Sequence, residues 1–126
     1  MKAISTPNAP AAISSYSQGR VHGNLLFVSG QLPIDPATGK LIEGDAATQL
    51  GQCLRNVAAI AEAAGASLNN ALRVAVMVTD LGEFGSINAA YQTFFTAPFP
   101  CRATFQVAAL PMGAKVEVEA TIGLAS

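Results

Sequence analysis

The chain has 126 residues, of which 51% are apolar and 12% are charged, and its formal net charge is −1. This length suits a single domain around one core, which we expect to span residues 1–126. The lack of Lys and Arg clusters argues against a nucleic-acid-binding surface, and the lack of a long apolar run or a signal peptide argues for a cytoplasmic protein.

The first predicted elements are two strands that form a hairpin. Residues 20–21 and 25–29 flank His22-Gly23-Asn24, a favourable hairpin turn. Gly30 to Pro33 ends the second strand. Residues 35–39 then form a loop, because Asp, Pro, Thr and Gly are typical of turns.

A helix is predicted over residues 46–64, because apolar side chains recur there at helical spacing. Asp45 is a suitable N-cap, and Gly65 stands where a C-terminal glycine belongs. The next segment, residues 71–79, alternates between two faces as a strand does. One face of this strand carries Leu72, Val74, Val76 and Val78.

A second helix is predicted over residues 80–96, opened by a capping box between Asp80 and Glu83. Two further strands follow, over residues 102–108 and 115–122. The element order β-β-α-β-α-β-β predicts an α+β fold in which both helices pack on one face of the sheet.

The last two strands each have one apolar face and one polar face. If the apolar faces meet the helices, the polar side chains lie on the helix-free side of the sheet. That surface is then available to solvent, to a partner subunit or to a site between subunits. The side chains placed there are Arg102, Thr104, Glu117 and Glu119.

The inventory of reactive residues excludes several classes of site. One histidine, two cysteines without metal or redox spacing and no glycine-rich phosphate loop argue against a metal, nucleotide or pyridoxal phosphate cofactor. Ser29 lacks the His and Asp partners of a serine hydrolase. The high apolar content predicts a homo-oligomer, although abundant alanine is an alternative explanation.

Any chemistry is expected to be organised around Arg102. By itself, Arg102 could be a surface arginine or an ion-pair partner of Glu117 or Glu119. Alternatively, its guanidinium could bind the carboxylate of a small acidic substrate bidentately. Glu119, if it lies nearby, could then bind or activate water as a general base.

Other polar residues have both a structural and a functional interpretation. Tyr16 is a lone tyrosine in a polar segment and could be partly exposed for structural reasons. Asn88 lies on an apolar helix stripe, where its amide could bond the backbone or face a ligand. Ser29-Gly30-Gln31 is either a strand exit or a cluster of ligand-binding groups.

Four segments, taken together and in order, resemble the YjgF/RidA family of reactive-intermediate imine deaminases. They cover most of the chain, which makes their combination more specific than any one of them. The segments are Ala9-Pro10-Ala11-Ala12-Ile13-x-x-Tyr16-Ser17-Gln18, Val28-Ser29-Gly30-Gln31-Leu32-Pro33, Asn88-Ala89-Ala90-Tyr91-x-x-Phe94-Phe95, and Pro100-x-Arg102 through Lys115-Val116-Glu117-Val118-Glu119-Ala120.

This resemblance implies a chorismate-mutase-like α+β fold with a mixed sheet, a homotrimer, and clefts between adjacent subunits. It also implies cofactor-free hydrolysis of 2-imino acids, formed from enamines such as 2-aminoacrylate, to 2-keto acids and ammonia. Arg102 would hold the substrate carboxylate, and Glu119 would position water. The pocket would be lined by Tyr16, Ser29, Gly30, Asn88 and the backbone around Thr104.

Two other functions remain as alternatives. Relatives of this family have also been described as endoribonucleases or translation inhibitors, but a slightly acidic chain with one histidine is poorly equipped for RNA cleavage. The second alternative is a non-catalytic keto-acid-binding or chaperone-like trimer. It would use the same arginine as the deaminase.

Overall fold

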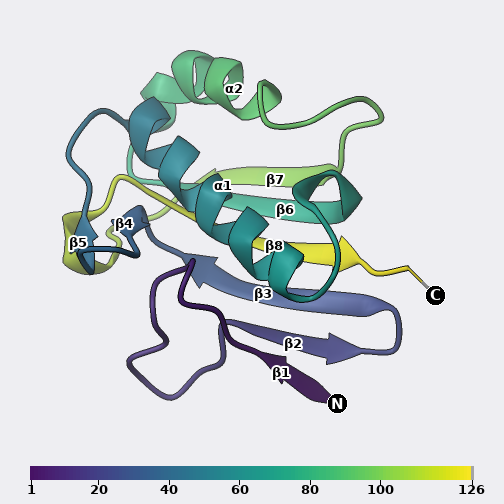
Figure 1. The fold of residues 1–126 in the computed structure, drawn as a ribbon. Helices are drawn as coiled ribbons and strands as arrows, with labels where there is room; N and C mark the ends of the chain where they lie inside the picture. Colours follow the sequence, from purple (N-terminus) through teal and green to yellow (C-terminus); the bar gives the residue numbers. More distant parts are fainter. Residues whose placement is uncertain (126) are drawn as a thin grey trace.

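The computed structural model describes residues 1–125, which form a mixed six-stranded sheet, two α-helices and a separate two-stranded ribbon (Figure 1). The order across the sheet is β1-β2-β3-β8-β6-β7. Its strands are β1 (Lys2–Ile4), β2 (Gly19–His22), β3 (Leu25–Gln31), β6 (Ala71–Val78), β7 (Cys101–Gln106) and β8 (Val116–Gly123). The ribbon pairs β4 (Ile34–Asp35) with β5 (Lys40–Leu41).

The first helix, α1 (Ala46–Ala63), begins at the predicted residue and ends one residue before the predicted end, with Ala64 as its C-cap. The carboxylate of Asp45 accepts a hydrogen bond from the backbone N–H of Thr48 at 2.9 Å, which caps the first turn. Gly65 follows the helix with a φ of +84°, a conformation that glycine adopts without strain. No helix in residues 1–125 is both long and apolar enough to cross a membrane.

The second helix, α2 (Phe84–Gln92), is shorter than predicted. A 3₁₀ turn over Leu81–Glu83 precedes it, because the Asp80 carboxylate accepts from the backbone N–H of Gly82 at 2.8 Å. At its other end the Thr93 hydroxyl donates to the carbonyl of Ala90, a local bond that competes with helix continuation. The helix therefore ends before residue 96.

Both helices belong to crossover connections between parallel strands. β6 and β7 pair in parallel, and α2 links them. β3 and β6 also run in the same direction, since each pairs antiparallel with β8 between them, and α1 lies in the connection that joins them. Both crossovers progress in the same direction across the sheet, so two crossovers of one hand bring their helices to one side, and both helices lie on the same side in Figure 1. The predicted α+β arrangement is confirmed.

One core joins the two helices to the central strands. Its members include the apolar stripe of α1, two residues of α2 and alternate residues of β6 and β8. The most completely buried of these side chains are Leu26, Leu50, Leu54, Val57, Ile60, Val74, Val76, Val78, Val116, Val118 and Ile122. The alternation that predicts the inner face of β6 holds for Val74, Val76 and Val78, whereas Leu72 is 52% exposed beside a shift in register with β8.

Three short strands were not predicted. β1 has three residues and pairs only with β2 at the sheet edge, and β4 and β5 have two residues each. A segment this short contains too few residues to show a two-residue alternation. The loop that composition predicts over residues 35–39 is the turn between β4 and β5.

The predicted facing of β7 is wrong. In the parallel register of β6 and β7, Arg102 lies opposite Val74 and Thr104 lies opposite Val76. Because paired residues share a face of the sheet, Arg102 and Thr104 lie on the helix side with these core valines. The apolar face of β7 points away from the helices instead, and Phe105 on it is 43% exposed.

The prediction for β8 is correct. Its apolar residues face the helices, and Glu119 and Glu117 lie opposite Ala75 and Met77 on the helix-free side. β8 is central and covered by α1, so its apolar side chains have a core to enter. β7 is an edge strand, where burial within the chain does not decide the facing.

Buried amide side chains form hydrogen bonds that connect the loops to the helices and the sheet. The buried polar residues among residues 1–125 are Gln18, Gln31, Gln49 and Asn56, and none of them is ionisable. Asn56 Nδ2 donates to the carbonyls of Leu32 at 3.1 Å and Ile34 at 2.9 Å. These bonds tie the segment after β3 to α1.

We expect Asn56→Ala to lower the free energy of unfolding by about 2 to 4 kcal/mol, because two carbonyls lose their donor. Chemical denaturation followed by circular dichroism measures this change. Asn69→Ala, at an exposed position, is the matched control and should change the free energy by less than about 0.5 kcal/mol. Equal effects of the two substitutions would contradict this role of Asn56.

Candidate functional site

Four of the predicted site residues line one open groove of about 640 Å³ beside the end of β3. They are Tyr16, Ser29, Gly30 and Glu119, and Glu117 lines the groove with them. We call this cavity the carboxylate groove. Its other wall is mainly apolar and includes Pro10, Ile13, Leu32, Ile34, Pro111 and Met112.

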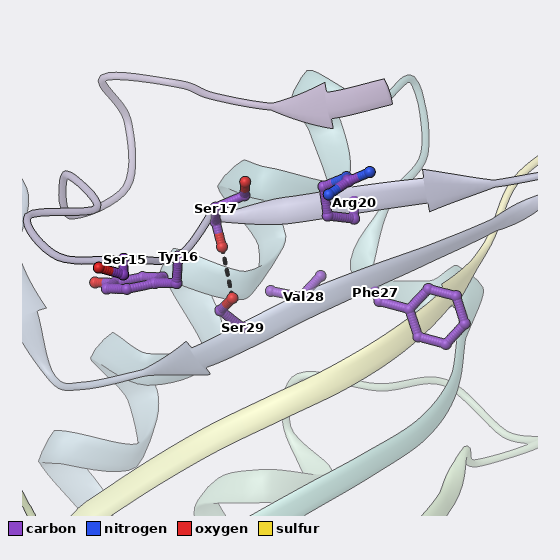
Figure 2. A pocket seen from close by; sticks show the side chains of 7 residues that line it. All are labelled: Ser15, Tyr16, Ser17, Arg20, Phe27, Val28 and Ser29. Carbon is purple, nitrogen blue, oxygen red and sulfur yellow. Dashed lines mark hydrogen bonds between the residues drawn. The ribbon is translucent and has the colours of Figure 1, made fainter. Parts of the chain in front are cut away.

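The loop that carries Tyr16 is held from both sides. The Ser29 hydroxyl donates to the carbonyl of Ser17, as Figure 2 shows, and the Ser29 N–H donates to the carbonyl of Gln18 at 2.9 Å. The buried side chain of Gln18 in turn donates to the carbonyls of Ala9 and Pro10. Tyr16, 47% exposed, therefore projects from a well-anchored loop.

Gly30 allows a carboxylate to lie against the backbone of β3. A Cβ at this position would lie 2.6 Å from Glu117 Oε2, closer than real Cβ contacts. The register of β3 with β8 also shifts between Val28 and Gln31, as it does at a β-bulge. A side chain at this position would therefore displace the Glu117 carboxylate from its place against β3.

Glu117 is a functional candidate that sequence reasoning missed. Burial raises the pKa of its carboxyl, and the negative charge of Glu119 raises that pKa further. The signal in the sequence was the alternation of β8, which puts Glu117 on the same face as Glu119. Nothing in that alternation showed that both carboxylates line one groove.

Arg102 lies in a different cavity, of about 340 Å³, which we call the arginine cleft. It is lined by Asn88, Tyr91, Gln92, Phe99, Pro100 and Arg102. Arg102 Nη1 donates to Asn88 Oδ1 at 2.7 Å, a charge-assisted hydrogen bond. The sequence predicted that the Asn88 amide bonds the backbone or faces a ligand, so its bond to Arg102 was not predicted.

Two aromatic rings of α2 also contact the guanidinium. Arg102 Cζ lies 4.7 Å from the ring centroid of Tyr91 and 5.4 Å from that of Phe84, within the range of cation–π interactions. Arg102 is nevertheless exposed, so a ligand can reach it. A guanidinium held by an amide and two rings is suited to binding a carboxylate in a defined orientation.

The predicted site residues thus fall into two groups that one chain does not bring together. Arg102 and Asn88 lie on the helix side of the sheet, and Glu119 lies on the opposite side with the carboxylate groove. The alternative in which Arg102 forms an ion pair with Glu117 or Glu119 of its own chain is contradicted by this separation. Thr104 lies farther along β7 and lines neither cavity.

The raised pKa of Glu117 predicts that Glu117→Gln stabilises the protein at neutral and higher pH. The folded state holds the Glu117 proton to higher pH than the unfolded state, so stability falls as pH rises through that window. The glutamine removes this loss, and its benefit should disappear below the ordinary glutamate pKa, at about pH 4.

Urea denaturation as a function of pH measures this difference. Glu62→Gln, on an exposed part of α1, controls for the removal of one negative charge. A Glu117→Gln benefit that is constant from acid to neutral pH would show that ionisation is not its cause.

The sequence as a whole is similar to well-defined relatives. The family described as endoribonuclease L-PSP matches residues 6–123. The RutC family protein y4sK of Sinorhizobium fredii is 54% identical over 96% of this chain and 96% of its own length. The 2-iminobutanoate/2-iminopropanoate deaminase of Escherichia coli is 47% identical, covering 94% of each chain.

The fold is also similar to that of a relative with a known structure. The crystal structure of RidA from an Antarctic Psychrobacter species superposes with a TM-score of 0.95 and 43% sequence identity, covering 98% of this chain and 100% of that one. Similarity at this level of identity, over almost the full length of both chains, extends beyond a shared fold. The chain belongs to the endoribonuclease L-PSP family, the YjgF/RidA family that its four sequence motifs resemble.

Proposed function

We propose that this protein is a 2-iminobutanoate/2-iminopropanoate deaminase that hydrolyses reactive 2-imino acids to 2-keto acids and ammonia. The observation that carries the proposal is the Arg102 guanidinium, which is held by Asn88 at 2.7 Å and still open to a ligand. The name of the E. coli relative supports the same activity, whereas y4sK is named only by its family.

Hydrolysis of a 2-imino acid requires that the substrate be oriented and that protons be transferred. The substrate carboxylate binds the free edge of the Arg102 guanidinium, and this contact fixes the position of the neighbouring C=N bond. The protonated imine carbon is already electrophilic, so water adds to it once a base accepts a proton. Glu119 accepts that proton and returns it to the nitrogen of the adduct. The C–N bond then breaks and ammonia leaves, while the C=O bond forms as Glu119 accepts the remaining hydroxyl proton, which passes to solvent.

A site that contains both Arg102 and Glu119 requires two subunits, because the two side chains lie on opposite sides of the sheet in one chain. The proposed site therefore joins the arginine cleft of one subunit to the carboxylate groove of its neighbour. Exposed aromatic side chains support such an assembly, since Phe27 is 48% exposed and Phe105 is 43% exposed. We propose a homotrimer with three such sites, as the family resemblance implies.

A non-catalytic trimer that binds keto acids would use the same arginine. Binding of 2-ketobutyrate alone does not separate the two functions, since this keto acid is also a product of the proposed reaction. Turnover of an imine separates them. The endoribonuclease named in the family description has less support, because a chain of net charge −1 is poorly suited to binding RNA phosphates.

Arg102→Ala should lower kcat/KM for imine hydrolysis by about 100-fold, because a charged hydrogen-bonded contact to the substrate is lost. Arg102→Lys keeps the charge without the planar fork and should recover only part of this loss. Ammonia and keto-acid release are measured with a 2-aminoacrylate-generating enzyme. Arg55→Ala, at an exposed position of α1, should retain full activity, and unchanged turnover in Arg102→Ala would overturn the proposal.

Mixing two inactive variants tests the two-subunit site. When Arg102→Ala and Glu119→Ala are unfolded together and refolded in equal amounts, about a quarter of the interfaces should combine an intact Arg102 with an intact Glu119. Ammonia release should therefore return in the mixture, while each variant refolded alone stays inactive. A mixture that contains mixed oligomers by native mass spectrometry and remains inactive would exclude this arrangement.

A further inference from the structure

We propose that Asn88, Phe84 and Tyr91 of α2 act as positioning residues for Arg102, and that Asn88 serves because its amide oxygen is a neutral acceptor. This inference rests on the proposed function in one respect, which is that the anion bound by Arg102 is a substrate or product carboxylate. The contacts of Arg102 with these three residues are present in the protein without a ligand.

The three residues are presented together by the helix. Phe84, Asn88 and Tyr91 are spaced by four and three residues, so they lie on one face of α2. β7 runs past that face, and its register with β6 points Arg102 toward α2. The guanidinium consequently meets all three side chains.

Asn88 occupies only part of the donor capacity of Arg102. A guanidinium has five N–H groups, and the bond to Asn88 Oδ1 uses one from Nη1. The groups on Nη2 and Nε stay available as a bidentate fork for a carboxylate. Because the amide oxygen carries no net charge, it orients the guanidinium without neutralising it.

A carboxylate in place of the amide would have the opposite effect on a ligand. It would hold the guanidinium at least as firmly, through a charge-assisted bond. It would also cancel the positive charge and repel an incoming anion. Asparagine at this position therefore combines firm orientation with a full positive charge.

The two rings restrict the guanidinium further. Tyr91 is 4% exposed and packs against Phe95 with a centroid separation of 4.7 Å, so its ring has little freedom to move. The Arg102 guanidinium lies over this ring and over that of Phe84. The rings attract the cation, and among residues 1–125 the buried Tyr91 hydroxyl forms no hydrogen bond, so neither ring occupies a remaining N–H group of Arg102.

This inference predicts an order of affinities that a purely structural role does not. If Asn88 merely preserved the local structure, the closely isosteric Asn88→Asp would be milder than Asn88→Leu. If Asn88 is needed as a neutral acceptor, Asn88→Asp should weaken 2-ketobutyrate binding by about tenfold or more and should be the more damaging substitution. Isothermal titration calorimetry on the assembled full-length protein measures this order.

Ser86→Asp is the matched control, because it adds the same negative charge to α2 at an exposed position outside the Phe84, Asn88 and Tyr91 face. Its affinity for 2-ketobutyrate should stay within about twofold of that of the unchanged protein, since exposed charges are screened by salt. An equal loss in Ser86→Asp and Asn88→Asp would overturn the inference.

A second measurement needs no ligand. In the unchanged protein, ¹⁵N nuclear magnetic resonance should detect restricted rotation of the Arg102 guanidinium, with the signal assigned through Arg102→Lys. We expect this restriction to persist in Asn88→Asp and to be lost in Asn88→Leu. Equal mobility in all three proteins would overturn the inference even if every variant is active.

The two proposals fail in different ways. If 2-ketobutyrate affinities follow the expected order but no imine is turned over, the deaminase proposal fails and the positioning role stands. If imines are turned over and Asn88→Asp binds 2-ketobutyrate at least as tightly as Asn88→Leu, the positioning role fails alone. Absence of any 2-ketobutyrate binding by the unchanged protein would overturn the positioning role as stated.

Discussion

Strand β7 pairs in parallel with β6, with Arg102 opposite Val74, and this register decides which side of the sheet each candidate functional group occupies. The pairing sends the guanidinium toward α2 and the apolar side chains of β7 toward the helix-free side. β8, on the other edge of β6, sends Glu117 and Glu119 to that same helix-free side. The separation of arginine and glutamates follows from these two registers, and the proposed site needs a second subunit because of it.

The groups around the two cavities are held by different means. Uncharged amides anchor the loops beside the carboxylate groove, as the Asn56 and Gln18 bonds show. Their hydrogen bonds do not change with pH, so these loops keep their shape while nearby acids titrate. The half-buried Glu117 is such an acid, because burial and the charge of Glu119 raise the pKa of its carboxyl.

The names carried by the family point to different chemistry, and the residues help to decide between them. RNA cleavage calls for cationic phosphate contacts, which a chain of net charge −1 without basic clusters is poorly able to make. Imine hydrolysis calls for an anion-binding group and a carboxylate near the reacting carbon. Arg102, held by Asn88, has the charge that the first group requires, and Glu119 in the carboxylate groove has the acid group that the second requires.

The sequence by itself determined the parts of this protein that depend on local patterns. Asp45 and Gly65 mark the two ends of α1, because capping is a property of neighbouring residues. The colinear motifs were sufficient to name the family and most residues of the candidate site. Alternation along β7 showed that Arg102 and Thr104 share a face. Only the tertiary structure decided that this face meets α2. Which face of an edge strand is turned toward the helices depends on its register with a partner strand distant in sequence and on what covers it. The Asn88 contact joins residues that lie 14 positions apart, and no local periodicity reports a contact made across a helix and a strand.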